Sequence, residues 1–199
     1  EGAKLADPDG TRGKSVGIRI ELPFEQDVNA FVTDAFEHKT FFTRLHHFVL
    51  ASDAFIVTPG GIGTVLEMLM VWQLLQVRHL KDTPLILAGH FWDGLIEWAK
   101  TEMLRPDVRL VNPGDLNIPQ VLPDGPAIVT AVREHHQRIQ RVDDRAHRVE
   151  TRSAVDDDEV ERAEHLSNAR ERRAALVVIA GSRRARRGSA GNQMKRVID

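Results

Sequence analysis

The sequence of 199 residues contains no cysteine and no tyrosine. The lack of cysteine excludes disulfide scaffolds, thiolate zinc sites and cysteine nucleophiles, and the lack of tyrosine excludes acid–base chemistry by a phenol. No apolar run approaches the roughly 18 residues that a membrane-spanning helix needs. The chain also has no large excess of positive or negative charge, since it contains 27 Lys and Arg residues and 29 Asp and Glu residues. This balance argues against a chain that coats nucleic acid.

The start of the chain carries no feature of a secretory signal peptide. Glu1-Gly2-Ala3 is followed by neither an apolar run nor a small-residue cleavage site. The absence of cysteine agrees with a reducing cytosol. We therefore expect a cytoplasmic protein whose partners include neither a membrane nor a nucleic acid.

Composition changes near residue 140. Before that point, apolar runs alternate with amphipathic stretches, and after it charged residues dominate. The apolar runs predict strands, and apolar residues at helical spacing predict helices. The predicted strands are 15–22, 30–35, 53–58, 84–88 and an edge strand at 116–121, and the predicted helices are 39–51, 64–77, 92–104 and 126–139.

Apolar strands that alternate with helices are typical of a mostly parallel sheet covered on both faces. We therefore predict an α/β, Rossmann-like domain over residues 1–140. Ligands of such sheets bind beyond the carboxyl ends of the strands. Residues 141–199 are predicted to form a charged, poorly ordered extension, within which 156–175 suits a polar helix and 174–180 has the composition of a strand.

A glycine-rich segment, Pro59-Gly60-Gly61-Ile62-Gly63-Thr64, lies between a predicted buried strand and a predicted helix. Glycines allow a tight turn and let an anion approach the backbone N–H groups. The helix N-terminus adds free N–H donors and a positive partial charge. Thr64 can cap the helix or donate its hydroxyl to a phosphate. We predict a phosphate-binding loop made of Gly60, Gly61, Ile62, Gly63 and Thr64.

Glu67 follows Thr64 by three residues, and this spacing has two interpretations. In one, Thr64-x-x-Glu67 is a capping box, in which both side chains accept hydrogen bonds from backbone N–H groups at the helix start. In the other, the carboxylate contacts a bound phosphorylated ligand at a part other than the phosphate, such as a sugar, because like charges repel. The spacing alone slightly favours the capping box.

The segment Pro59–Glu67 resembles the PGGxGTxxE signature of the LONELY GUY (LOG) family, Rossmann-like nucleoside 5′-monophosphate phosphoribohydrolases long labelled as lysine decarboxylases. Three further segments are similar to family segments and occur in the family's order. These are Ser15–Gln26, Phe41–Arg44 and Thr83–Leu87. The resemblance covers roughly residues 1–140.

The resemblance implies that Arg44 and Glu67 are the catalytic pair. The implied reaction is hydrolysis of the N-glycosidic bond of AMP or a cytokinin riboside monophosphate, giving the free base and ribose 5-phosphate. A carboxylate near the ribose suits an oxocarbenium-like transition state, and an arginine can bind phosphate or assist the departing base. No cofactor and no metal is expected. The apolar helix predicted at 64–77 suits a homodimer.

Two departures from the family pattern leave alternatives open. Leu45 stands where the family has a lysine after the arginine, which favours a nucleotide-binding or carrier protein without chemistry. The family's first two strands, which end in Gly-Ser and Gly-Gly turns, have no counterpart before Glu1, so an N-terminally incomplete, inactive fragment is a third reading. The run 174–180, followed by Gly181-Ser182, could mimic the first of these strands.

Other polar residues are weaker candidates. His46 and His47 are adjacent and point about 100° apart on a helix, so they do not form a facial metal site with His38 by themselves. Asp34, predicted at a strand end, reads as a turn residue rather than a ligand contact. Glu25, Gln26 and Asn29 follow a predicted strand and are expected in a loop near the mouth of the pocket.

Overall fold

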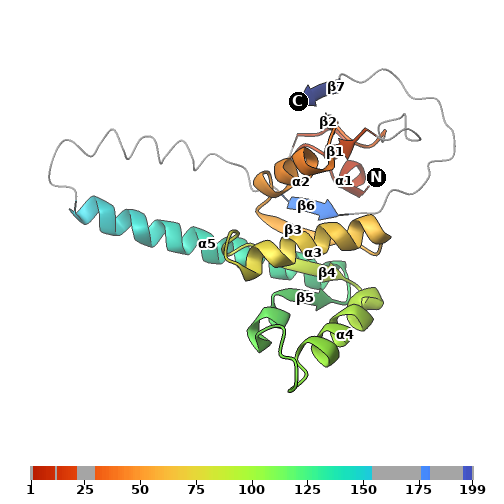
Figure 1. Ribbon diagram of the computed structural model, residues 1–199. Coiled ribbons are helices and arrows are strands. Elements are labelled where there is room, and N and C mark those ends of the chain that lie inside the picture. Colours follow the sequence, from red (N-terminus) through yellow and green to blue (C-terminus); the bar gives the residue numbers. More distant parts are fainter. Residues whose placement is uncertain (1, 12, 22–29, 154–175, 180–194, 199) are drawn as a thin grey trace. The chain divides into compact units, whose positions relative to one another are not determined.

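The computed structural model describes residues 2–11, 13–21, 30–153, 176–179 and 195–198 (Figure 1). The chain divides into two compact units. Unit 1 comprises Glu1–Ala51 and Arg183–Asp199, and unit 2 comprises Ser52–Ser182. Every strand pair among the described residues is parallel, so the predicted α/β class with parallel sheets is confirmed.

Unit 1 contains a three-stranded sheet in the order β1-β2-β7. Ile18 pairs with Phe36, and Phe36 pairs with Arg196. The helix α2 packs against β1 and β2, and its Phe48 is buried. The elements are α1 (Gly2–Ala6), β1 (Val16–Ile20), β2 (Asp34–His38), α2 (Phe41–Leu50) and β7 (Lys195–Ile198).

The second strand differs from the prediction. It was expected at 30–35, but β2 begins at Asp34, which pairs with Val16. The N–H groups of Thr33 and Asp34 both donate to the carbonyl oxygen of Ser15, at 2.6 and 3.2 Å. These bonds set the start of the ladder, so tertiary pairing overrides the higher β-propensity of the residues before it. Asp34 therefore begins a strand rather than ending one, and it forms an ion pair with Lys14 at 3.2 Å.

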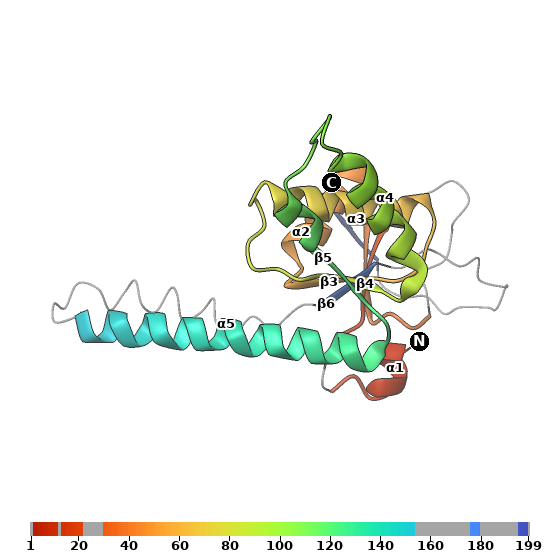
Figure 2. The same cartoon turned by 90° about the horizontal axis from the view of Figure 1, so that it is seen from below.

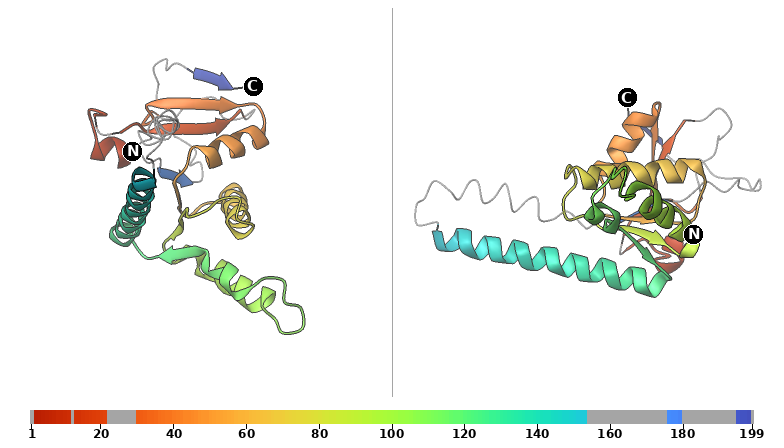
Figure 3. Two further views of the ribbon diagram at one scale, coloured as in Figure 1. Left: turned by 90° about the vertical axis from the view of Figure 1, so that its left-hand side faces the viewer. Right: turned by 60° about the horizontal axis from the view of Figure 1, so that its bottom comes forward.

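Unit 2 contains a four-stranded sheet in the order β5-β4-β3-β6. The helix α5 lies along one face of this sheet, and α3 and α4 lie on the other (Figures 2 and 3). The predicted covering of both faces is thus present in this unit. Its elements are β3 (Ala54–Val57), α3 (Ile62–Gln76), β4 (Leu85–Ala88), η1 (His90–Trp92), α4 (Asp93–Met103), η2 (Pro113–Asn117), β5 (Pro119–Leu122), α5 (Gly125–Ser153) and β6 (Leu176–Ile179).

The core of unit 2 is built around β3 and β4. These strands bury their side chains almost completely, as continuous apolar runs in parallel sheets do. Trp92 is also buried, and its indole N–H donates to the carbonyl oxygen of Val57 at 3.2 Å. This bond ties η1 to the last residue of β3, directly before the glycine loop. The buried apolar residues of β3, α3, β4 and η1 are Ala54, Phe55, Val57, Met68, Val71, Leu85, Ile86, Leu87 and Trp92.

The last helix is longer than predicted. The last helix was expected at 126–139, whereas α5 continues to Ser153. The run predicted as a strand at 174–180 contains β6. Predictions for 22–29, 156–175 and 180–194, including Glu25, Gln26, Asn29 and Gly181-Ser182, fall outside the described residues. Among the helices that the structure describes, none combines the length and apolar character needed to cross a membrane.

Candidate functional site

The glycine loop joins the carboxyl end of β3 to the start of α3. The helix begins at Ile62, with Gly61 as the N-cap residue in an extended conformation (φ −90°, ψ −161°). Val65 is the first residue whose N–H donates within this helix, to the carbonyl oxygen of Gly61 at 3.1 Å. The N–H groups of Ile62, Gly63 and Thr64 therefore have no intrahelical partner, and no side-chain cap is present at this helix start.

The capping-box interpretation of Thr64 and Glu67 is wrong. Thr64 is the third residue of α3 rather than its N-cap, so its side chain does not occupy the position that a capping box requires. The sequence reading failed because Gly63 is a poor helix former, and it therefore suggested a helix that starts at Thr64. Neither the hydroxyl of Thr64 nor the carboxylate of Glu67 therefore caps the start of this helix.

Thr64 and Glu67 lie on the buried face of α3. Their exposed fractions are 3% and 6%, and a separation of three residues puts both on one side of a helix. A buried carboxylate is costly unless other groups compensate its charge. Packing of the apolar core does not require polar side chains at these two buried positions, which lie in the first two turns after the glycine loop.

Gly60 is held against Thr64 by the tight turn. A Cβ atom added at Gly60 would collide with Oγ1 of Thr64 and would lie 2.7 Å from its Cβ atom, whereas a Cβ at Gly61 or Gly63 would meet nothing within 4 Å. The three glycines consequently have different roles. Gly60 permits close packing within the protein, and Gly61 and Gly63 leave open space beside the N–H groups of the loop.

Arg44 lies on α2 in unit 1. Its Nε–H donates to the carbonyl oxygen of Ile18 in β1 at 3.2 Å, and its guanidinium carbon lies 6.0 Å from the ring centroid of Phe41. These contacts hold the side chain against the strand on which α2 packs. Leu45, which stands in place of the family lysine, is half-buried on the same helix. Arg44 and Glu67 therefore belong to different units of the chain.

A histidine pair next to Arg44 was missed by the sequence reading. Nε2 of His38, the last residue of β2, lies 3.0 Å from Nδ1 of His47 on α2, so one ring donates to the other and at least one is neutral. His38 is 1% exposed, and within the described residues its Nδ1 has no hydrogen-bond partner. Burial, followed by the charges of His47 and Arg44, lowers the pKa of His38.

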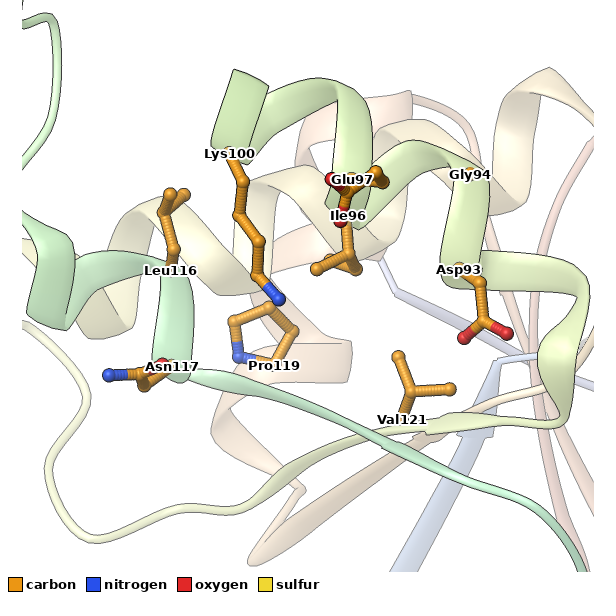
Figure 4. A pocket seen from close by; sticks show the side chains of 9 residues that line it. All are labelled: Asp93, Gly94, Ile96, Glu97, Lys100, Leu116, Asn117, Pro119 and Val121. Carbon is orange, nitrogen blue, oxygen red and sulfur yellow. The ribbon is translucent and has the colours of Figure 1, made fainter. Parts of the chain in front are cut away.

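A separate cavity of about 650 Å³ lies in unit 2 between α4 on one side and η2 and β5 on the other. Figure 4 shows the amine of Lys100 extending toward Pro119 and the carboxylate of Asp93 on the side of Val121. Asp93 and Glu97 bring two carboxylates to its wall, which disfavours a phosphate there. None of the residues predicted for the site lines this cavity. Its remaining lining residues are Gly94, Ile96, Leu116 and Asn117.

Replacement of Gly60 by alanine tests the close approach to Thr64. We expect Gly60→Ala to lower the free energy of unfolding by about 1–3 kcal/mol, because overpacking forces neighbouring atoms apart. Urea unfolding measures the change. Gly61→Ala and Gly63→Ala are the matched controls, since their added Cβ atoms meet open space. Equal stability of all three variants would contradict the steric role of Gly60.

The lowered pKa of His38 predicts a loss of stability in acid. The unfolded chain binds a proton to this histidine at a higher pH than the folded chain does. The contribution of neutral His38 to the free energy of unfolding is therefore complete above about pH 6.5 and declines as the pH falls below that value. Urea unfolding of the wild type and of His38→Gln between pH 8 and pH 5 measures this. The wild type should lose more stability on acidification than His38→Gln does.

The control for this experiment is His79→Gln, at an exposed histidine that follows α3. This variant should keep the pH dependence of the wild type. Parallel pH profiles for wild type and His38→Gln would show that the burial of His38 contributes nothing to acid sensitivity.

The comparison with known proteins identifies the family of the chain. A family model described as "Possible lysine decarboxylase" matches residues 6–132, which include α2, the glycine loop and Glu67. A search of the curated proteins found no match. Because the matched residues make up more than half of the chain, the protein belongs to the family that this model describes, the LOG family.

Proposed function

We propose that the protein hydrolyses the N-glycosidic bond of a purine nucleoside 5′-monophosphate, such as AMP or a cytokinin riboside monophosphate. The products are the free base and ribose 5-phosphate. The observation that carries the proposal is the buried carboxylate of Glu67 on α3, less than two turns after a glycine loop whose helix start has no side-chain cap. Family membership supports the same chemistry.

The glycine loop supplies the phosphate-binding part of the mechanism. The N–H groups of Ile62, Gly63 and Thr64 have no intrahelical partner, and the helix start carries a positive partial charge. A 5′-phosphate would accept hydrogen bonds from these groups, as anions do at helix N-termini. The open space beside Gly61 and Gly63 leaves room for its oxygens. The phosphate would thereby anchor the ribose toward α3.

Glu67 would act on the ribose and the attacking water. In the reaction, the bond from C1′ to the base nitrogen breaks, and a new bond forms from C1′ to a water oxygen. The carboxylate can stabilise the positive charge that develops on the sugar and can accept a proton from the water. The base leaves with the electron pair of the broken bond and takes up a proton. Neither a metal nor a cofactor enters this scheme.

Arg44 is the proposed second catalytic residue. A guanidinium can contact the phosphate or stabilise the departing base. Its Nε–H donates to the carbonyl oxygen of Ile18, which holds the side chain against β1. Leu45 brings no second cation to this helix, and this observation favours the alternative that the protein binds a nucleotide without hydrolysing it.

Substitution of Glu67 separates catalysis from binding. We expect Glu67→Gln to lower kcat for release of adenine from AMP by about 10²–10³-fold, the loss typical of removing a group that stabilises transition-state charge. The affinity for AMP should change little, because the phosphate contacts are intact. Chromatography of the free base and calorimetry of AMP binding measure the two quantities. N6-isopentenyladenosine monophosphate serves as the second substrate.

The matched control is Glu97→Gln, the same chemical change at an exposed carboxylate on α4, which should leave turnover unchanged. Normal turnover by Glu67→Gln would contradict the catalytic role of Glu67. Binding of AMP by the wild type without release of base from either substrate would identify a carrier. An absence of both binding and turnover would favour the incomplete-fragment alternative.

A second copy of the chain is the proposed protein partner. Ile62, Leu66 and Leu69 are 85%, 47% and 42% exposed, and their spacing of four and three residues aligns them in one stripe along α3. An exposed apolar stripe of this kind is typical of a helix that packs against another helix. Because the stripe begins at the glycine loop, a homodimer built on it would bring two loops near its interface.

Replacement of Leu66 by a charged residue tests this dimer. Leu66→Glu should shift the protein to a monomer in light scattering coupled to size-exclusion chromatography, because a carboxylate in an apolar interface is costly to desolvate. Thr101→Glu, at an exposed position of α4, is the control and should keep the mass of the wild type. A monomeric wild type, or a dimeric Leu66→Glu variant, would contradict the interface.

A further inference from the structure

The cavity between α4, η2 and β5 has the size of a small-molecule site. Its volume of about 650 Å³ falls within the range of about 300–1,000 Å³ that is typical of ligand pockets. All of its lining residues belong to unit 2, and neither the glycine loop nor Glu67 is among them. The cavity is therefore separate from the proposed nucleotide site and has room for a ligand of its own.

Both walls of the cavity are attached to other elements of unit 2. The carbonyl oxygen of Asp115 in η2 accepts a hydrogen bond from the indole N–H of Trp72 at 2.8 Å, and its carboxylate accepts one from the amide of Gln76 at 2.9 Å. These bonds hold η2 against α3. The other wall, α4, continues directly from η1, whose Trp92 is buried. Because each wall is held by contacts outside the cavity, the space between them does not depend on a ligand.

Opposite charges stand at the two ends of this cavity. Asp93 and Lys100 are seven residues apart on α4, which puts them on one face of the helix and about 10 Å apart along its axis. Figure 4 shows Lys100 and Asn117 toward one end and the carboxylate of Asp93 toward the other. One oxygen of that carboxylate, Oδ2, lies 3.0 Å from Nδ1 of His90. Within the part of the chain that the structure describes, Lys100 forms no ion pair.

The part of the cavity between the charged ends is mainly apolar. Ile96, Leu116 and Pro119 are buried residues that line it, and Val121 is half-buried there. Glu97 also lines the cavity, but its carboxylate lies on the other side of Ile96 from Val121 (Figure 4). An aliphatic chain is stabilised by contact with such a surface, because its own apolar area is removed from water.

We propose that this cavity binds a small linear zwitterion, an aliphatic ω-amino acid. Its ammonium group pairs with the carboxylate of Asp93, and its carboxylate pairs with the amine of Lys100 and the amide of Asn117. The aliphatic chain between them lies against the apolar part of the wall. The ammonium group also compensates the negative charge of the two carboxylates that line the cavity, which a free phosphate cannot do. This inference does not depend on the proposed hydrolase activity.

Amide NMR titrations of the full-length protein test the site with three probes, which are 6-aminohexanoate, hexylamine and hexanoate. The first carries both charges, and each of the others carries one. We expect 6-aminohexanoate to bind at least about tenfold more tightly than either of the others, because only it forms both charge-assisted pairs. The amides of Gly94 and Asn117 should shift during the titration, and those of Gly61 and Gly63 in the glycine loop should not.

Substitutions at the two ends assign the charges. Lys100→Met keeps an aliphatic side chain and removes the charge, so it should weaken binding of 6-aminohexanoate by about tenfold without weakening that of hexylamine. Asp93→Asn should weaken the binding of both amines. Lys81→Met, at an exposed lysine outside the cavity, is the matched control for the lysine variant and should bind all three probes as the wild type does.

Gly94→Leu keeps the test decisive if the charge variants fold poorly. A Cβ atom at Gly94 meets nothing within 4 Å, and leucine is a better helix former than glycine, so α4 should tolerate the change. The leucine side chain should fill the cavity and abolish binding of 6-aminohexanoate. Thr101→Leu adds the same side chain at an exposed position of α4 outside the cavity and should leave the affinity unchanged.

Three results would each overturn the proposal. The first is equal affinity for 6-aminohexanoate, hexylamine and hexanoate, or binding of none of them, since the two charged ends would then not select a zwitterion. The second is a Gly94→Leu variant that binds 6-aminohexanoate as tightly as the wild type does. The third is a titration that shifts the amides of Gly61 and Gly63 instead of those of Gly94 and Asn117, because the ligand would then occupy the glycine loop.

Discussion

The close packing of Gly60 against Thr64 is the constraint on which the candidate site depends. The contact leaves no room for a side chain at position 60, so it fixes how the chain turns from β3 into α3. The position of this turn decides which N–H groups are free at the helix start and which face of α3 carries Glu67. The carbonyl oxygen of Val57, one end of the turn, is held in turn by the indole N–H of Trp92. The glycine loop is therefore held before its start by the bond from Trp92 to Val57 and at its end by the packing of Thr64 on Gly60.

The buried strands of unit 2 were predictable because a strand covered on both faces appears in a sequence as an apolar run. β3 and β4 fall inside the ranges expected for them. The start of α3 was not predictable in this way, since Gly63 lies in the first turn of the helix although glycine disfavours a helix locally. The shift of β2 has the same origin, because the hydrogen bonds to Ser15 outweigh the preferences of residues 30–33.

In the candidate site, too, some features could be predicted from adjacent residues and others depend on tertiary packing. The glycine loop and Glu67 are adjacent in sequence, so a motif was sufficient to find them. His38 and His47 are nine residues apart on a strand and a helix, and their 3.0 Å contact depends on how α2 packs on β2. No spacing rule relates such a pair. The sequence contained only a weaker signal, the concentration of three histidines around Arg44.

The start of α3 favours a ligand with one particular pattern of charge. The N-cap residue is Gly61, which has no side chain that could accept a hydrogen bond, so the N–H groups of the first helical turn can donate to a phosphate. Ile62 and Glu67 are about 7.5 Å apart along the helix axis. At that separation, with an effective dielectric constant near 20, a phosphate charge and the carboxylate repel by about 2 kcal/mol. One charge-assisted hydrogen bond contributes about as much, and the loop offers several. The proposed substrate, a ribose 5-phosphate attached to a base, would place its anion at the loop and an uncharged or electron-poor group near Glu67.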